Sequence, residues 1–411
     1  MANMAEQMSS NPKKPQTISR NKLLVISGTG WMFDAMDVGI LSFVIAAIAV
    51  EWNLAPASIG WVGSINSLGM MVGAIGFGLL ADRIGRKRVF MLTLVLFSVA
   101  SGLSALTTTL LAFLILRFFV GAGLGGELPV ASTLVSESVE AKERGKIVVL
   151  LESFWAAGWL IAALIAYFVI PAFGWRAALI ITALPAFYAI YLRRNLPDSP
   201  RFVKAGAPKQ SVLEKMSALW AKPYRRRTLM LWIVWFTVVF SYYGMFLWLP
   251  SVMVLKGFAM IKTFGYVLLM TLAQLPGYFS AAWLIERTGR KFVLSTYLIG
   301  TALSAVAFGN ADTLPMLLLF GALLSFFNLG AWGALYAYSP EQYPTSIRGT
   351  GTGMAAGIGR IGGIFGPLLV GSMLTAGYGF GLIFGIFCGA ILIGVLAVIF
   401  LGTETKQMEL E

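Results

Sequence analysis

The feature that most constrains this chain is a series of apolar segments long enough to cross a lipid bilayer. Segments such as 89–106 and 379–401 contain no charged residue. An uncharged run of 18 or more residues spans roughly 30 Å of hydrocarbon as a helix. Of the 411 residues, 58% are hydrophobic and 12% are charged, whereas soluble domains have roughly 45–50% and about 25%. The sequence therefore predicts an all-α integral membrane protein.

Polar breaks divide the chain into twelve predicted spans, arranged as two sets of six. The N-terminal half covers 23–192, with spans near 23–50, 58–80, 89–107, 110–136, 147–170 and 176–192. The C-terminal half covers 228–401, with spans near 228–255, 263–285, 292–309, 313–338, 349–375 and 378–401. A basic, proline-containing linker at 193–227 joins the halves, and 210–220 could form a short amphipathic helix on the membrane surface.

The distribution of basic residues predicts the orientation of the chain. The net charge is +13, from 31 Lys and Arg against 18 Asp and Glu. With the N-terminus inside, all but five of the basic residues fall on cytosolic tails or loops, as the positive-inside rule requires. The five exceptions are Arg117, Arg176, Lys256, Lys262 and Arg360. We therefore expect cytosolic tails at 1–22 and 402–411, and a topological role for the basic charge rather than nucleic-acid binding.

Composition also limits the chemistry of the chain. There is no histidine, and Cys388 is the one cysteine, so histidine metal ligands and a disulfide framework are excluded. The sequence contains no G-x-S-x-G and no C-x-x-C, so the hypothesis of a membrane enzyme is disfavoured. The basic N-terminal tail does not resemble a signal peptide. We expect no enzyme activity, no cofactor and no metal, and a monomer whose partners are the bilayer, protons and a small-molecule substrate.

Two loop motifs occur twice at one offset. The segment 80–89 (LADRIGRKRV) aligns with 284–293 (LIERTGRKFV), and 136–146 (SESVEAKERGK) aligns with 340–350 (PEQYPTSIRGT). Both pairs are separated by 204 residues. Two motifs at one offset indicate two six-helix halves in the same orientation, an architecture typical of transporters with the binding site between the halves.

The charged residues of these motifs are predicted to form a cytosolic gate. Ion pairs that form only when the cytosolic side is closed would favour one state of a two-state carrier. The alternative is that they only anchor the topology, but a topology signal needs no carboxylates. The predicted gate residues are Asp82, Arg86, Glu137 and Arg144 in the first half, and Glu286, Arg290, Glu341 and Arg348 in the second.

Asp34 and Asp37 lie three residues apart in the first span, so they project from nearly one face of a helix. A charge at the bilayer centre costs roughly 2.5–3.5 kcal/mol on insertion scales. Proximity disfavours joint ionisation of the two carboxyls, so one of them could exchange a proton near neutral pH. Arg117 in the fourth span is the natural counter-charge. The alternative is a static salt bridge, although buried ion pairs stabilise poorly for their cost.

Three further charges lie within the predicted spans. Arg360 lies in the glycine-rich segment 353–367, whose string 357-GIGRIG-362 follows no strand and therefore indicates close helix packing rather than a dinucleotide site. Its fork of donors suits a substrate carboxylate, but it could equally pair with an acid of the first or fourth span. Glu152 is assigned to the cytosolic charge network rather than to substrate binding, and Glu127 could belong to either.

Aromatic residues near the middle of the spans are candidate substrate contacts. A flat aromatic acid needs stacking surfaces and a cation, while ordinary packing is the alternative for any single residue. The polar amides Gln274 and Asn328 could bond a ring nitrogen, a carboxylate or a neighbouring helix. The aromatic candidates are Trp155, Trp159, Tyr242, Tyr243, Trp332 and Tyr336.

The loop and span motifs together resemble the major facilitator superfamily over essentially the whole chain, in its sugar-porter and organic-ion branch. The resemblance implies a twelve-helix fold and alternating access. In proton-coupled sugar porters a span-1 aspartate and a span-4 arginine pair and part, and Asp37 and Arg117 match those positions. Aromatic-acid symporters carry a similar D-x-x-D in span 1. The motifs are GLLADRIGRKR (78–88), RFFVGAGLGG (117–126), PDSPR (197–201) and TETK (403–406).

Within the superfamily, the sequence departs from the sugar porters. Their span-7 glutamine pair is replaced by 236-FTVVFSYYG-244, and Trp159 occupies the place of a sugar-binding glutamine. The segments 31–43, 123–137 and 150–159 resemble bacterial niacin transporters, which implies proton symport of nicotinate across a bacterial inner membrane. An aromatic-acid/proton symporter, a facilitator for nicotinamide or another organic solute, and a proton-driven drug exporter stay open. A sensor that no longer cycles is disfavoured because the gate residues are intact.

Overall fold

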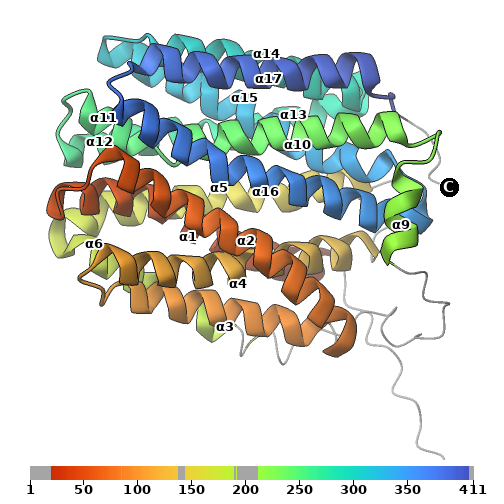
Figure 1. Ribbon diagram of the computed structural model, residues 1–411, viewed down its shortest axis with the longest axis horizontal. Coiled ribbons are helices and arrows are strands. Elements are labelled where there is room, and N and C mark those ends of the chain that lie inside the picture. The colour runs from red at the N-terminus through yellow and green to blue at the C-terminus, as the bar shows by residue number, and fades with distance from the viewer. Residues whose placement is uncertain (1–19, 85, 138–143, 189–190, 192–211, 407–411) are drawn as a thin grey trace, which may run out of the picture.

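The computed structural model describes residues 20–84, 86–137, 144–188, 191 and 212–406. This part of the chain folds into a bundle of long helices aligned with the longest axis of the molecule, and contains no strand (Figure 1). The N-terminal helices are α1 (Arg20–Glu51), α2 (Pro56–Ile84), α3 (Arg86–Ser104), α4 (Leu110–Glu137), α5 (Arg144–Phe168) and α6 (Ile170–Ile181).

A short helix, α9 (Val212–Leu219), precedes the second set and confirms the helix expected near 210–220. The C-terminal helices are α10 (Arg225–Phe246), α11 (Leu249–Leu255), α12 (Met260–Leu272), α13 (Gln274–Thr288), α14 (Arg290–Gly309), α15 (Leu314–Glu341), α16 (Thr345–Thr375) and α17 (Phe380–Leu401).

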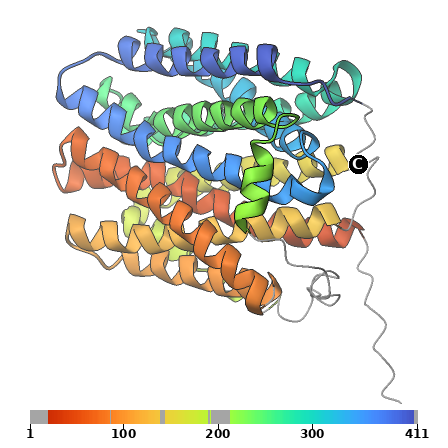
Figure 2. The ribbon, with the colours of Figure 1, turned by 45° about the vertical axis from the view of Figure 1, so that its right-hand side comes forward.

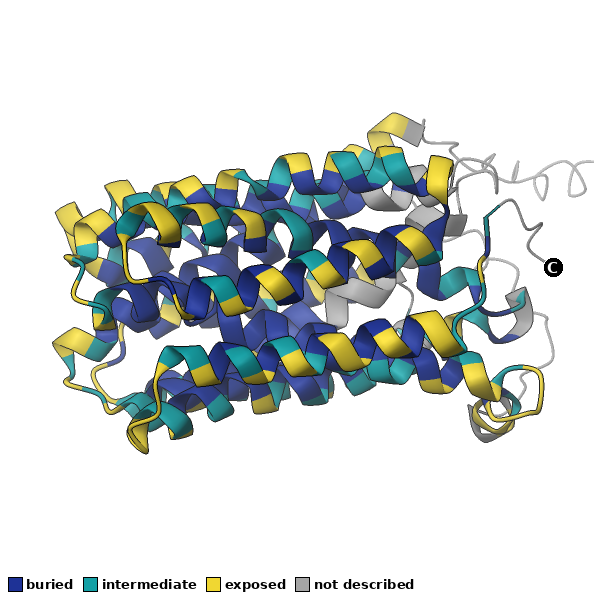
Figure 3. Ribbon diagram, turned by 90° about the horizontal axis from the view of Figure 1, so that it is seen from above, coloured by how far each residue is buried: buried dark blue, intermediate teal, exposed yellow. Residues whose placement is uncertain are grey.

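The hydrophobic lengths of these helices agree with the twelve predicted spans. Ten described segments are long and apolar enough to cross a membrane, and two shorter apolar helices at 88–104 and 110–125 correspond to the third and fourth spans. In Figure 3 the exposed residues lie on the outward faces of the helices and the buried ones face the interior. Large exposed apolar side chains such as Ile75, Leu303 and Phe400 belong to this outward surface, as expected where lipid is the solvent. The predicted all-α membrane class is confirmed.

Three predicted spans differ in detail from single straight helices. The span at 228–255 is divided between α10 and α11, and the span at 263–285 between α12 and α13. Pro250 and Pro276 lie near the starts of α11 and α13; a proline has no N–H to donate and is tolerated in a first helical turn. In α6, Gly174 has φ +80, a conformation that glycine adopts at little cost.

The sequence repeat reappears as a repeat of helix boundaries. Helix α2 ends at Ile84 and α13 at Thr288, which are 204 residues apart. Helix α3 begins at Arg86 and α14 at Arg290, again 204 apart. The described ends of the helices on either side of the two loop motifs are therefore 204 residues apart.

Glycines allow the helices within each set to approach closely. A Cβ added at Gly69 or Gly73 of α2 would collide with the backbone of Phe118 or Ala122 in α4. The glycine-rich segment of α16 packs in the same way: a Cβ at Gly362 would lie 2.5 Å from the Phe236 carbonyl oxygen of α10. Within the G-x-G-x-x-G string, Gly359 and Gly362 therefore pack closely against α10, whereas a Cβ at Gly357 would have no atom within 4 Å.

Both ends of the described chain and α9 lie at one end of the bundle, which we call the terminal end (Figures 1 and 2). At the opposite, far end the two sets of helices are packed together through α2 and α16. The Ser64 hydroxyl donates to the Ile364 carbonyl at 2.6 Å, and the Ala57 N–H donates to Thr375 Oγ1 at 3.1 Å. A Cβ at Gly371 would lie 2.5 Å from the Pro56 carbonyl oxygen. The far end is therefore closed along this helix pair.

Candidate functional site

A buried charge cluster lies inside the N-terminal helices. Asp37 of α1 and Arg117 of α4 are both 0% exposed, and Arg117 Nη1 lies 3.3 Å from Asp37 Oδ2. The Ser101 hydroxyl of α3 donates to Asp37 Oδ1 at 2.5 Å and accepts from Arg117 Nη2 at 2.9 Å. Ser101 also lies 2.7 Å from the hydroxyl of Thr182, which follows α6. Residues of α1, α3 and α4, together with Thr182 after α6, thus hold the carboxylate and the guanidinium in contact.

The structure divides the two acids of α1 between different arginines. Asp37 pairs with Arg117, whereas Asp34 is close enough to Arg360 of α16 for a charge–charge interaction. Asp34 is buried, with 2% of its surface exposed. The predicted pair of neighbouring carboxyls is therefore split, because a spacing of three residues places them at adjacent but different positions around the helix.

Arg360 lies in the interior at the contact between the two sets of helices. Its Nη1 donates to the Tyr243 hydroxyl at 3.0 Å and approaches Met70 Sδ at 3.4 Å. Met70 belongs to α2 and Tyr243 to α10, so residues of both sets surround the guanidinium. Only Nη1 of Arg360 has a hydrogen-bond partner among the described residues. The other N–H donors of the guanidinium are therefore available to an anionic ligand.

The predicted aromatic residues form one continuous cluster at this contact. Trp155 Nε1 donates to the Tyr242 hydroxyl at 2.9 Å, which joins α5 to α10. The rings of Trp155 and Trp332 are stacked at a centroid distance of 6.4 Å, and Tyr242 lies 4.9 Å from Trp332. Trp159 meets Tyr242 edge to face at 6.3 Å. The cluster presents several ring faces and edges within one buried region.

Tyr336 extends this cluster by one helical turn along α15. Its ring lies 5.9 Å from that of Trp332 and 4.9 Å from that of Trp235 in α10. Trp235 is held by a hydrogen bond from its indole N–H to the Ser339 hydroxyl at 2.9 Å. Every aromatic residue proposed from sequence therefore lies in or beside one interior cluster.

Several buried polar side chains beside the cluster make no hydrogen bond to any described residue. Buried polar groups in folded proteins are nearly always satisfied, so such a concentration marks a place that takes a polar ligand or ordered water. The predicted amides Gln274 and Asn328 are both completely or almost completely buried. The atoms are both amide positions of Gln274 and Asn328, Trp332 Nε1, the Tyr278 hydroxyl and Glu152 Oε2.

Glu152 lies in α5 one turn before Trp155, and the N-terminal charge network to which the sequence assigned it lies outside the described residues. The Glu152 side chain is buried, and the ring of Trp155 is 4.9 Å from that of Trp31 in α1. Helix α5 also packs against α13 and α15, which carry Tyr278 and Tyr336. The sequence signal was available, because Glu152, Trp155 and Trp159 follow the i, i+3, i+7 spacing of one helix face.

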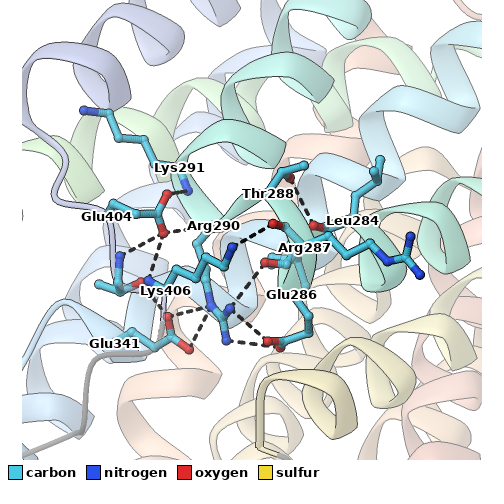
Figure 4. A network of polar contacts seen from close by, with 11 residues as sticks. Leu284, Glu286, Arg287, Thr288, Arg290, Lys291, Glu341, Glu404 and Lys406 are labelled. Atoms are coloured by element: carbon cyan, nitrogen blue, oxygen red, sulfur yellow. Dashed lines mark hydrogen bonds and ion pairs between the residues drawn. The ribbon is translucent and has the colours of Figure 1, made fainter.

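The charged residues of the second loop motif form a network with the C-terminal segment (Figure 4). Arg290 Nη1 lies 3.1 Å from Glu286 Oε2, and Arg290 Nε lies 3.1 Å from Glu341 Oε2. The Glu404 carboxylate accepts the backbone N–H groups of Arg290 at 2.9 Å and Lys291 at 3.1 Å. These contacts join α13, α14, α15 and the segment after α17, so each lies within the C-terminal set.

The remaining predicted gate residues are only partly accounted for. Arg348 Nε donates to the carbonyl oxygens of Pro340 and Tyr343, at 3.0 and 3.2 Å. The side chains of Asp82, Arg86, Glu137 and Arg144, and that of Glu127, lie outside the described residues.

The sequence reasoning missed several residues that complete these clusters. Ser101 and Thr182 are small hydroxyl residues in apolar helices and carry no sequence signal. Trp31 and Tyr278 resemble ordinary span aromatics until the fold places them beside Glu152. Among the described residues, no group of three or more Cys, Asp and Glu side chains is placed to hold a metal ion.

Comparisons with known proteins agree with this architecture. The family model described as Major Facilitator Superfamily matches residues 29–280 and 260–410. A Bacillus subtilis protein named "Putative niacin/nicotinamide transporter NiaP" is 67% identical over 97% of this chain and 100% of its own length. The Niacin transporter NiaP of Acinetobacter baylyi is 47% identical over 95% of both chains.

A solved structure shares the fold. The xylose transporter XylE from E. coli, in a partially occluded inward open conformation, has a TM-score of 0.76, covering 95% of this chain and 99% of its own. At 19% identity this likeness concerns the fold alone. The family and the relatives are transporters, which confirms the expectation that the chain is not an enzyme.

Proposed function

The chain belongs to the major facilitator superfamily, and we propose that it imports nicotinate across a bacterial cell membrane by proton symport. As a multi-pass transporter it moves a small molecule. The observation that carries the choice of substrate is the position of Arg360: an always-charged fork of donors, buried between the two sets of helices and adjoining a cluster of aromatic rings. A small planar anion needs this combination. The names of two relatives, each containing niacin, support the same substrate.

In this proposal the substrate carboxylate binds Arg360, and its ring lies against the aromatic cluster. Tyr243 orients the guanidinium through its 3.0 Å hydrogen bond. Trp155, Trp159, Tyr242, Trp332 and Tyr336 supply the ring surfaces. Gln274 and Asn328 supply hydrogen bonds, since both buried amides make none to the described residues. Because α5, α10, α15 and α16 all contribute, movement of one set of helices against the other would disassemble the site.

We assign proton coupling to Asp37, with Arg117 as its counter-charge. When Asp37 is ionised, Arg117 and Ser101 neutralise and satisfy it. Protonation removes the charge on Asp37 and weakens its attraction to Arg117, so the packing of α1 against α3 and α4 would change with the proton. Asp34 has a supporting role, because it acts on Arg360 and so connects the charge of α1 with the substrate site.

For alternating access, we place the terminal end in the cytosol, as the positive-inside distribution indicates. The two six-helix sets, 23–192 and 228–401, are then the two moving bodies, and the closed α2–α16 contact is the extracellular gate. The duplicated Asp/Glu–Arg residues of the loops serve as the cytosolic gate. In its C-terminal copy, the Glu286–Arg290–Glu341 network would hold α13, α14 and α15 together as one body during the movement.

The experiment is uptake of labelled nicotinate into proteoliposomes, with and without an outside-acid pH gradient. The proposal predicts accumulation beyond equilibrium only with the gradient, and competition by benzoate but not by glucose. Equilibration without overshoot would contradict symport and leave a facilitator. Stronger competition by nicotinamide than by nicotinate would contradict the role of Arg360 and favour a neutral substrate, which the name of the Bacillus relative also includes.

A further inference from the structure

Glu152 is the buried acid that the proposed mechanism leaves unused. Its residue is 2% exposed, and its Oε2 makes no hydrogen bond to any described residue. Helix α5, which carries Glu152, packs against α1, α13 and α15, among others. Two of these three helices belong to the C-terminal set. Glu152 therefore faces the same contact between the sets as the substrate cluster.

The position along α5 brings Glu152 close to the aromatic rings. It precedes Trp155 by three residues, and Trp332 precedes Tyr336 by four, so Glu152 and Tyr336 both lie one turn nearer the terminal end than the Trp155–Trp332 stack. Arg360 reaches the same cluster through Tyr243, whose ring lies 5.3 Å from that of Tyr242. The acid and the arginine thus adjoin one aromatic cluster.

The contacts of Glu152 differ from those of Asp37. Asp37 has a guanidinium and a hydroxyl on its carboxylate, whereas Glu152 Oε2 accepts no hydrogen bond from any described residue. An ionised carboxylate with no adjacent cation is costly in a low-dielectric interior. A protonated carboxyl has one O–H donor, which needs an acceptor.

We propose that the protonated Glu152 carboxyl donates a hydrogen bond to a ring nitrogen of the substrate, while Arg360 binds the substrate carboxylate. This inference rests on the proposed function and deepens it, because it names the residue that distinguishes pyridine carboxylates from aromatic acids without a ring nitrogen. A pyridine nitrogen is an acceptor in the plane of the ring, and the ring of benzoate has no such acceptor. A site that hydrogen-bonds a substrate group rejects the analogue without it, because the buried partner is left unpaired.

The test compares competition by unlabelled nicotinate and benzoate against labelled nicotinate, in wild type, Glu152→Gln and Glu152→Met. The amide of Glu152→Gln keeps a donor but has no titratable proton, whereas the methionine keeps the approximate volume and has no donor. For wild type, we expect at least tenfold weaker competition by benzoate than by nicotinate. Glu152→Gln should keep this preference, and Glu152→Met should lose it through weaker nicotinate binding, with benzoate binding unchanged. Picolinate and isonicotinate, which place the nitrogen at other ring positions, should compete more weakly than nicotinate in wild type.

The outcomes separate this inference from the proposed function. Equal competition by nicotinate and benzoate in wild type would overturn the ring-nitrogen contact but leave an aromatic-acid carrier. An unchanged preference in a folded Glu152→Met would also overturn it, and loss of the preference in Glu152→Gln would assign Glu152 to proton transfer instead. Absence of any uptake or binding of nicotinate by the wild type would overturn both proposals. Thermal unfolding and size-exclusion profiles of each variant show which of them are folded.

Discussion

The Arg117 guanidinium lies 3.3 Å from the Asp37 carboxylate, and both side chains are fully excluded from solvent. Removal of one member of a buried pair typically costs about 3–5 kcal/mol, since the other charge stays buried without compensation. The pair can therefore respond strongly to one proton, which is what a coupling site requires.

Asp37→Asn should abolish gradient-driven accumulation of substrate, because the amide cannot take up and release the proton. Substrate exchange across the membrane, which needs no net proton movement, should continue in part. The measurement is uptake with an outside-acid gradient beside counterflow without one. Uphill accumulation at the wild-type level in Asp37→Asn would remove this residue from the coupling mechanism. Asp34→Asn is the matched control: it removes a carboxyl from the same helix, leaves the Asp37–Arg117 pair in place, and should keep gradient-driven accumulation at saturating substrate.

The same pair predicts a compensation in stability. Asp37→Asn leaves Arg117 buried with no counter-charge, so its melting temperature in detergent should fall. The double variant Asp37→Asn, Arg117→Gln removes both charges and should recover most of the loss, since an uncharged pair carries no uncompensated charge. It should nevertheless stay unable to accumulate substrate. A double variant no more stable than Asp37→Asn would show that the charges are not coupled energetically.

Arg360→Met should weaken nicotinate binding about 10- to 100-fold, because a hydrogen bond to a charged group contributes about 1.5–3 kcal/mol. Arg360→Lys keeps the charge and loses the fork, so its loss should be smaller. Competition by the neutral nicotinamide should change little in either variant. Tyr243→Phe, which removes only the 3.0 Å contact to Arg360, is the conservative control and should have a smaller effect than Arg360→Met. Equal losses for nicotinate and nicotinamide in Arg360→Met would contradict carboxylate recognition.

The far-end contact between α2 and α16 offers a conformational lock. The Ala57 N–H and Thr375 Oγ1 are 3.1 Å apart, so Ala57→Cys with Thr375→Cys, in a Cys388→Ser background, should form a disulfide when this end is closed. The cross-linked protein should lose transport, and reduction should restore it. Each single-cysteine variant serves as a control and should be insensitive to oxidant. Full transport after complete cross-linking would show that this end does not open during the cycle.

At the terminal end, Glu404 should stabilise the start of α14. Its carboxylate accepts the backbone N–H groups of Arg290 and Lys291, and loss of such a cap costs about 0.5–2 kcal/mol. Glu404→Ala should therefore lower the melting temperature measurably, whereas alanine at the exposed Asp312 should not. If the two variants melt alike, the C-terminal segment contributes no net stability to this network.

Much of the fold could be predicted from sequence because, in a bilayer, the position of each span depends mainly on its own residues. Each span must satisfy its own backbone hydrogen bonds as a helix, so hydrophobic length alone indicates where a span lies. The 204-residue offset in the loops reappears in the boundaries of α2 and α13. The breaks after α10 and α12 were missed, although Pro250 and Pro276 mark both places, because a hydrophobic run continues through a proline without losing its apolar character.

The candidate site divides in the same way. The sequence by itself determined which residues are too polar for lipid and must therefore face the interior: Asp34, Asp37, Arg117, Glu152 and Arg360. The sequence and its resemblance to the superfamily also indicated the pairing of Asp37 with Arg117, which the structure contains, but only the tertiary structure placed Asp34 and Glu152. Asp37 pairs with Arg117, Asp34 acts on Arg360, and Glu152 lies beside rings of the other set of helices. The free-energy cost of placing a charged side chain in lipid depends on the residue type, which the sequence gives directly. Pairing depends on how helices distant in the chain are rotated against one another, and close packing fixes that rotation only in the assembled bundle.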